Sequence, residues 1–178
     1  MKTIYSILVA LIIGFLLFNC NGKRKTHTFV PKYNGPLIEV DSVNTVYTDS
    51  SVLKMKMKAL KQLEFENGNR EFPKGLILTF YKKNGVEDAI ISGNHGKFDK
   101  AKGYYTLTGK VVVQNHKEHK KLETEVLNWN PNTKKVFTDK FVIITTPTER
   151  LEGTGLDAEQ DFSHYEIREV SGISSLSK

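Results

Sequence analysis

A chain of 178 residues is long enough for one domain with a hydrophobic core and too short for two large domains. Hydrophobic residues make up 39% and charged residues 26% of the chain, a globular balance that excludes general disorder. The formal net charge of +6 would suit a membrane surface or an anionic ligand, but the lysines are scattered and no helix-turn-helix, zinc or aromatic RNA-binding pattern accompanies them. A nucleic-acid partner is therefore not expected.

The N-terminus carries a hydrophobic leader. Residues 4–18 form an almost unbroken apolar run, shorter than the roughly twenty residues that span a bilayer. Such a run is typical of the apolar region of a signal peptide. We therefore interpret residues 1–20 as a leader or anchor, and residues 21–36, which mix basic and polar residues with two prolines, as a tether.

Cys20 is the only cysteine, which excludes an internal disulfide and a thiolate metal cluster. It stands where a lipoprotein signal places the residue to be acylated, although Asn19 replaces the small residue expected before the cleavage site. Lipidation of Cys20, an uncleaved N-terminal anchor and ordinary secretion all stay open. The basic residues 23–25 complicate the anchor, because positive charge after a spanning segment favours the cytoplasmic side. We expect membrane attachment with the domain facing outward.

Residues 37–170 are predicted to form a single β domain. The clearest strand signal is at residues 53–59, where Leu53, Met55, Met57 and Ala59 alternate with three lysines, so that one face is apolar and the other charged. Methionines on such a face fill a core or make an adaptable ligand surface. No amphipathic helix follows the leader, and the Ser-rich residues 171–178 are expected to form a flexible tail.

Turn signals recur through the domain. Asn84-Gly85 predicts a hairpin with a type I′ turn, in which both central residues have positive φ. A weak repeat with a period of roughly thirty residues predicts stacked hairpins, each too small to bury its apolar face alone. The pattern indicates an antiparallel all-β sandwich, barrel or open roll. The matching segments of the repeat are Phe98-Asp99 with Trp129-Asn130, and Gly109-Lys110-Val111 with Asp139-Lys140-Phe141.

The chain carries little that supports catalysis. His116 and His119 lie in a predicted hairpin connection without further metal ligands, so no metal site is expected. The aspartates recur at turn positions, where hydrogen bonds to nearby backbone explain them. No Gly-x-Ser-x-Gly sequence occurs, and Gly153-Thr154-Gly155 is not followed by a helical pattern, so we interpret Gly153 and Gly155 as a bulge, bend or close backbone approach. An enzyme and a cofactor are not expected.

Large apolar side chains in extended segments are the remaining feature. They supply a sandwich core or an apolar trough between two sheets that takes acyl chains. The candidates for lining such a groove are Met55, Met57, Leu107, Val111, Val113, Leu127, Trp129, Phe137, Phe141 and Ile143.

Several motifs, in order, resemble the LptC family of lipopolysaccharide export proteins, a branch of the OstA-like β-jellyroll superfamily. The resemblance covers about residues 46–167, and the order and spacing of the motifs make it specific. The motifs are Tyr47-Thr48-Asp49-Ser50, Leu53-Lys54-Met55-Lys56, Phe65-Glu66-Asn67-Gly68, Glu71-Phe72-Pro73-Lys74-Gly75, Leu122-Glu123-Thr124-Glu125, Leu127-Asn128-Trp129, Phe137-Thr138-Asp139-Lys140-Phe141-Val142, Gly153-Thr154-Gly155-Leu156-Asp157-Ala158 and Asp161-Phe162-Ser163-His164-Tyr165-Glu166-Ile167.

The resemblance implies an open antiparallel β-jellyroll on the periplasmic face of the inner membrane. Such a subunit accepts lipopolysaccharide from an ABC transporter, whose membrane subunits carry similar β-jellyrolls, and passes it to a soluble bridge protein built from the same β repeat. The rolls stack through unpaired strand edges, and acyl chains travel in the interior groove. Relatives with a transmembrane helix differ from this chain, where Cys20 suggests a lipid anchor.

Three other functions stay open. The chain could be the soluble bridge protein of the same superfamily, which a retained or lipidated N-terminus would disfavour. It could be a structural envelope lipoprotein with no part in lipopolysaccharide delivery. An envelope hydrolase would depend on Glu123, Glu125 or Asp139.

Overall fold

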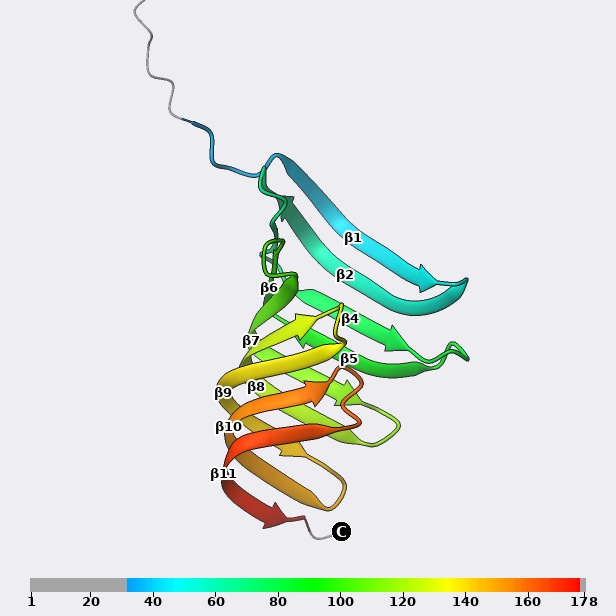
Figure 1. Ribbon diagram of the computed structural model, residues 1–178, viewed down its shortest axis with the longest axis vertical. Coiled ribbons are helices and arrows are strands. Elements are labelled where there is room, and N and C mark those ends of the chain that lie inside the picture. Colours follow the sequence, from blue (N-terminus) through cyan, green and yellow to red (C-terminus); the bar gives the residue numbers. More distant parts are fainter. Residues whose placement is uncertain (1–31, 177–178) are drawn as a thin grey trace, which may run out of the picture. The chain divides into compact units, whose positions relative to one another are not determined.

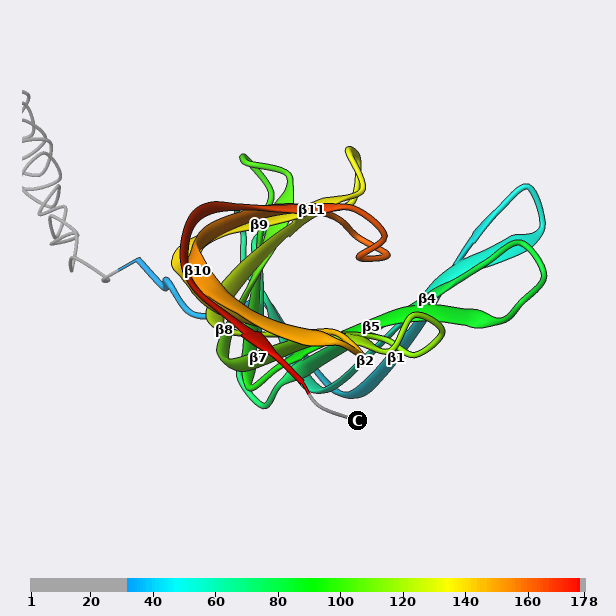
Figure 2. The ribbon, with the colours of Figure 1, turned by 90° about the horizontal axis from the view of Figure 1, so that it is seen from below.

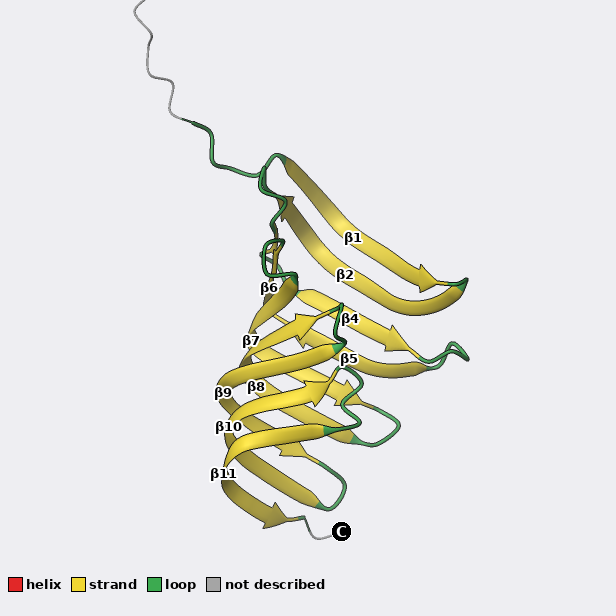
Figure 3. Cartoon of the chain, viewed as in Figure 1, coloured by secondary structure: helices red, strands yellow, loops and turns green. Residues whose placement is uncertain are grey.

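The computed structural model describes residues 32–176. The leader at residues 1–20, Cys20 included, and residues 21–31 of the predicted tether lie outside the described residues. Within the described part every regular element is a strand, and no helix there is long and apolar enough to cross a membrane (Figures 1 and 3). The strands are β1 (Ile38–Asp49), β2 (Val52–Glu64), β3 (Arg70–Phe72), β4 (Leu76–Tyr81), β5 (Glu87–Gly93), β6 (His95–Asp99), β7 (Tyr104–Asn115), β8 (Lys120–Asn130), β9 (Lys135–Thr145), β10 (Glu149–Glu159) and β11 (Tyr165–Ser175).

Alternating burial explains why these segments are strands. Leu76, Leu78 and Phe80 of β4 are buried, whereas Ile77 between them is exposed, which is the period-two pattern of a sheet with one covered face. The strand predicted at residues 53–59 is part of β2, with Met57 and other alternate residues turned inward. The prediction of an antiparallel all-β roll of stacked hairpins is confirmed.

The strands form one antiparallel sheet that divides into two walls. The first half of β7 pairs with β6 and its second half with β5, while β2 pairs with β4 through its first half and with β3 through its second. We call the two parts the β3–β6 wall and the β4–β5 wall. The longer strands bend from one wall into the other, so that the walls face each other across an interior (Figure 2).

The bend in the long strands is made by paired bulges. Gly109 and Lys110 of β7, both with positive φ, stand opposite the single residue Glu125 of β8. In the same way Asp139-Lys140 of β9 stands opposite Gly155 of β10. An extra residue on one strand bends it and increases its twist. The second matching segment of the thirty-residue repeat, at residues 109–111 and 139–141, therefore lies where β7 and β9 bend from one wall into the other.

Glycines at the same corner allow a close approach of strands. A Cβ on Gly153 would collide with the carbonyl oxygen of Glu169 in β11, and Gly155 has a φ of 77°, in the left-handed region that favours glycine. The segment Gly153-Thr154-Gly155 is thus both a close backbone approach and a bend.

Two predictions at the chain's turns and end were wrong in detail. Only Gly85 of the β4–β5 hairpin has positive φ, and the amide of Lys82 bonds to the carbonyl of Val86 at 2.9 Å. This is a three-residue loop with a glycine bulge instead of a type I′ turn, because one more residue separates the strands. At the C-terminus β11 runs to Ser175, where a flexible tail was expected from residue 171, because residues 172–175 pair with β10.

Candidate functional site

The interior between the walls is apolar and closely packed. Phe80 of the β4–β5 wall meets Trp129 of the β3–β6 wall edge to face, with ring centroids 5.3 Å apart. The ring centroid of Tyr105 lies 5.2 Å from that of Trp129 and 4.7 Å from that of Phe98, so the aromatic cluster extends along the β3–β6 wall. The buried hydrophobic residues of the described part are Met57, Ala59, Phe72, Leu76, Leu78, Phe80, Ala89, Ile91, Tyr105, Leu107, Val111, Val113, Leu122, Leu127, Trp129, Val136, Val142, Ile144, Leu156, Ala158 and Phe162.

The ten groove candidates divide between the two faces of the sheet. Met55 is half-buried and packs against the buried cluster, and six others belong to that cluster: Met57, Leu107, Val111, Val113, Leu127 and Trp129. The remaining three belong to the outer face of β9: Phe137, Phe141 and Ile143.

The outward placement of these three follows from their neighbours. Val142 and Ile144 are fully buried, so Phe141 and Ile143, which alternate with them, point away from the interior. Phe141 is 49% exposed, and Phe137 packs on the outward Tyr104 with ring centroids 5.7 Å apart.

Polar groups that face the interior are satisfied within the protein. The Thr124 hydroxyl donates to the carbonyl of Phe141 at 2.8 Å, and the Thr138 hydroxyl accepts from the amide of Lys140 at 3.1 Å, so both hold the bulged corner. At the other end of the β3–β6 wall, Arg70 donates to the Tyr105 hydroxyl at 3.2 Å. Burial raises the pKa of Tyr105 above its usual value, and the nearby guanidinium of Arg70 opposes that rise. The Tyr105 phenol is therefore neutral at physiological pH.

The groups considered for catalysis or metal binding do not converge. His116 and His119 lie exposed in the β7–β8 turn, and residues 32–176 contain no cluster of three or more His, Cys, Asp or Glu that could hold a metal ion. Glu123 pairs with Lys121 at 2.8 Å, and Asp139 pairs with Arg168 at 2.8 Å. These carboxylates belong to surface ion pairs.

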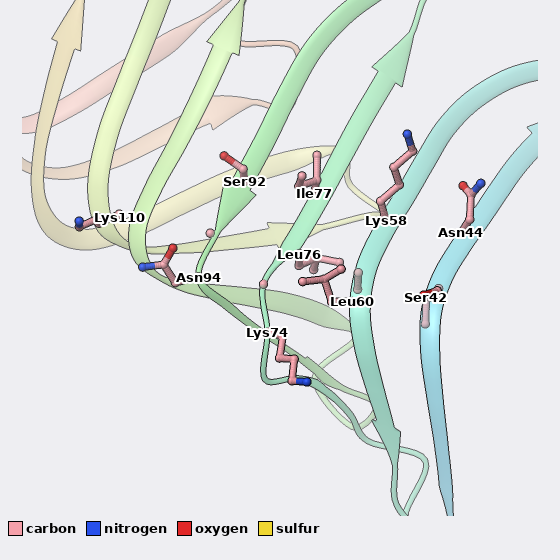
Figure 4. Close-up of a pocket in the computed structure, with 14 residues that line it drawn as sticks. Ser42, Asn44, Lys58, Leu60, Lys74, Leu76, Ile77, Ser92, Asn94 and Lys110 are labelled. Atoms are coloured by element: carbon pink, nitrogen blue, oxygen red, sulfur yellow. The ribbon is translucent and has the colours of Figure 1, made fainter.

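A cavity of about 830 Å³ opens on the outer face at the bend. Figure 4 shows Lys58, Ile77 and Ser92 pointing the same way from β2, β4 and β5, with Leu60 at the corner beside them. A second cavity, of about 560 Å³, shares Lys110 with the first and includes Phe141 and Ile143. The outer face therefore has apolar hollows at the bend, and their linings include residues of the buried cluster such as Leu76 and Val111.

The sheet ends in two unpaired edges. Within the described residues β1 pairs only with β2, and β11 pairs only with β10. Almost every residue of β1 is exposed, and so are most residues of β11. Unpaired strand edges can accept a further strand from another chain.

A family model described as "Lipopolysaccharide-assembly, LptC-related" matches residues 6–172. The chain belongs to this family. The resemblance of the sequence motifs to LptC proteins is thereby confirmed, and comparison with curated proteins found no match. Membership of the LptC-related family implies a role in lipopolysaccharide assembly or transport. It also implies a location in the cell envelope and interaction with lipopolysaccharide and its transport machinery. It is a transport family with no known catalytic activity.

Several interior residues of this LptC-related protein were not among the sequence candidates. Leu76, Leu78 and Phe80 alternate with outward residues, and that pattern could have identified them. Phe162 gives no such signal, because it lies in the loop between β10 and β11, outside any alternating strand, and is nevertheless fully buried.

Proposed function

We propose that this protein is a membrane-tethered periplasmic subunit of the lipopolysaccharide export machine. It receives lipopolysaccharide from an ABC transporter whose membrane subunits carry β-jellyroll domains, and it passes the lipid to a soluble β-jellyroll bridge protein. The observation that carries the proposal is the apolar interior, which runs between two walls and ends at two unpaired strand edges.

Acyl chains occupy the interior between the walls. Because inward side chains such as Leu107 and Leu127 already pack against apolar neighbours, an entering acyl chain exchanges one apolar contact for another. The walls must separate as this happens. The polar headgroup stays outside, at the open side between the walls.

The two edges dock the neighbouring rolls. Strand addition to an unpaired edge continues the sheet of one protein into the next and so prolongs the interior. The predicted membrane attachment precedes β1, so we assign the β1 edge to the transporter and the β11 edge to the bridge protein. The ATPase supplies the energy, and this subunit needs no catalytic group.

Photo-crosslinking at adjacent inward and outward positions tests the lipid path. Benzoylphenylalanine replaces either Met55, which faces the interior, or its neighbour Lys56, whose amine lies 5.2 Å from the outer Tyr81 ring. With the transporter reconstituted in vesicles, we expect an ATP-dependent lipopolysaccharide adduct at position 55 and none at 56. Adducts at position 56 alone would refute the interior path.

The same probe at exposed edge positions tests the docking. Val46 of β1 should capture a transporter subunit and Val170 of β11 the bridge protein. Capture of a bridge partner at both edges, together with a mature chain that lacks any anchor by mass, would favour the soluble bridge. Depletion without loss of lipopolysaccharide from the cell surface would favour a structural lipoprotein.

A further inference from the structure

The loop between β10 and β11, residues 160–164, crosses the open side of the roll. We call these five residues the strap. Figure 2 shows this loop turning in toward the space between the walls. At its centre Phe162 is completely buried and has a φ of 60°, a conformation that is uncommon for a residue with a large side chain. The backbone of the strap is therefore strained at Phe162, the residue whose ring it holds inside the protein.

The strap is bonded to the β3–β6 wall at its first residue. The indole Nε1 of Trp129 donates to Oε1 of Gln160 at 3.1 Å. The amide of Gln160 donates to the carbonyl of Lys134, in the β8–β9 turn, at 2.9 Å. Trp129 is only 4% exposed, so its indole N–H would lose a hydrogen bond if the strap moved away.

The strap is also bonded to the β4–β5 wall, on the far side of the opening. Asn115, at the end of β7 and 2% exposed, donates through Nδ2 to the carbonyl of Asp161 at 2.8 Å. The Oδ1 atom of the same side chain accepts from the amide of Glu118 at 2.9 Å, which fixes its orientation. The Lys120 amine lies 3.5 Å from the carbonyl of Ser163. Both walls therefore hold one short loop.

Phe162 completes the connection from inside. Its ring stacks on Tyr165 at the start of β11, with centroids 5.0 Å apart and planes 11° from parallel, and it belongs to the same apolar cluster as Leu107 and Leu127. The ring thus occupies apolar space of the kind that an acyl chain fills.

A closed strap has a topological consequence, which rests on the proposed function. A lipid in transit has its acyl chains in the interior and its headgroup outside. The bonds that join these two parts pass through the open side between the walls at every point of the path. It cannot move past a loop that bridges that side. We propose that the strap is a gate, and that an acyl chain takes the place of the Phe162 ring when the gate opens.

The gate divides the path into two parts along the β4–β5 wall. The strand order there is β2-β4-β5-β7-β8-β9-β10, and Asn115, which holds the strap, ends β7. Met55 in β2 lies before this point and Leu151 in β10 lies beyond it, and both are half-buried against the interior cluster. A closed gate lets lipid reach Met55 and stops it before Leu151.

A reversible disulfide tests the gate. The full chain with Asn115→Cys and Asp161→Cys, carrying benzoylphenylalanine at position 55 or 151, is reconstituted with the transporter, lipopolysaccharide and ATP. In the reduced protein we expect lipopolysaccharide adducts at both positions, and in the oxidised protein an adduct at 55 with loss of the adduct at 151. Asn115→Cys alone, treated with the same oxidant, controls for oxidation and for the lost Asn115 bond.

Each other outcome has a defined meaning. An adduct at 151 in the oxidised protein overturns the gate and leaves the proposed function standing. Loss of the adduct at 151 in the reduced protein also overturns it, because lipid then does not pass the strap at all. Absence of the adduct at 55 in both forms overturns the proposed function and the gate with it.

Trp129, the only tryptophan, gives a second measurement that does not depend on the disulfide. Opening breaks its bond to Gln160 and exposes the indole, so purified rough lipopolysaccharide should shift the emission to longer wavelength. The Phe162→Ala variant should bind the same lipopolysaccharide faster. Its Trp129 emission should already lie at longer wavelength before lipopolysaccharide is added. Binding to the unaltered protein without any shift would overturn the gate.

Discussion

Phe80 and Trp129 make an edge-to-face contact across the interior, with ring centroids 5.3 Å apart at an interplanar angle of 68°, although each belongs to a different wall. Both rings are almost fully buried, so this pair reports whether the walls are closed. Aromatic pairs of this geometry contribute about 0.5–1.5 kcal/mol beyond the burial of their surface. The contact links the stability of the domain to the state of its interior.

Replacing Phe80 with Ala should lower the free energy of unfolding by about 3–5 kcal/mol, because it removes a buried aromatic ring and leaves a cavity between the walls. Urea unfolding followed by circular dichroism measures the change. Ile77→Ala, on the outer face of the same strand and 45% exposed, is the control and should have a much smaller effect. Equal losses for the two variants would contradict a closed interior.

Gly153→Ala should disrupt the pairing of β10 with β11, because the new Cβ would collide with the carbonyl oxygen of Glu169 in the neighbouring backbone. We expect a loss of several kcal/mol, on the order of other overpacked sites. Gly172→Ala is the matched control, since a Cβ there meets only Glu152 side-chain atoms, at 3.7 Å. Hydrogen exchange of the β11 amides would locate the damage, and normal protection in Gly153→Ala would refute the close approach.

The β4–β5 turn can be tested by two alanine substitutions. Gly85→Ala should cost about 1 kcal/mol, because φ at Gly85 is 77° and no atom lies within 4 Å of the new Cβ. Asn84→Ala should cost less, since Asn84 has no positive φ and loses only an exposed hydrogen bond to the Val86 amide. Thermal unfolding of both variants decides between the turn types, because a type I′ turn requires similar strain at the two positions.

The raised pKa of Tyr105 predicts a loss of stability at alkaline pH. The folded protein binds this phenolic proton more tightly than the unfolded chain does. The resulting contribution to the free energy of unfolding is complete below the pKa of about 10 in the unfolded chain, and it disappears as pH rises through the raised pKa of the folded protein. Tyr105→Phe should flatten the fall in denaturation midpoint between neutral and strongly alkaline pH. Tyr104→Phe, on the outer face of the same strand, controls for the loss of a tyrosine hydroxyl as such.

The sequence determined the class of the fold and the family. Alternation at residues 53–59 predicts a strand with its apolar face inward, and β2 has that form. The repeat of Gly109-Lys110 with Asp139-Lys140 marks two positions where strands bend. These signals are local, because side-chain alternation and turn chemistry depend on neighbouring residues alone.

The tertiary structure decided which apolar side chains share the interior. In β9 both faces carry apolar residues, so alternation cannot tell whether Phe141 or Val142 points inward. A bulge between residues 138 and 141 also adds one residue to β9, which shifts its pairing with β10 by one residue. Only pairing with β8 and β10 assigns Val142 to the interior and Phe141 to the outer face. Phe162 depends on the tertiary structure even more, because its burial comes from walls that meet only when the whole sheet has curved around them.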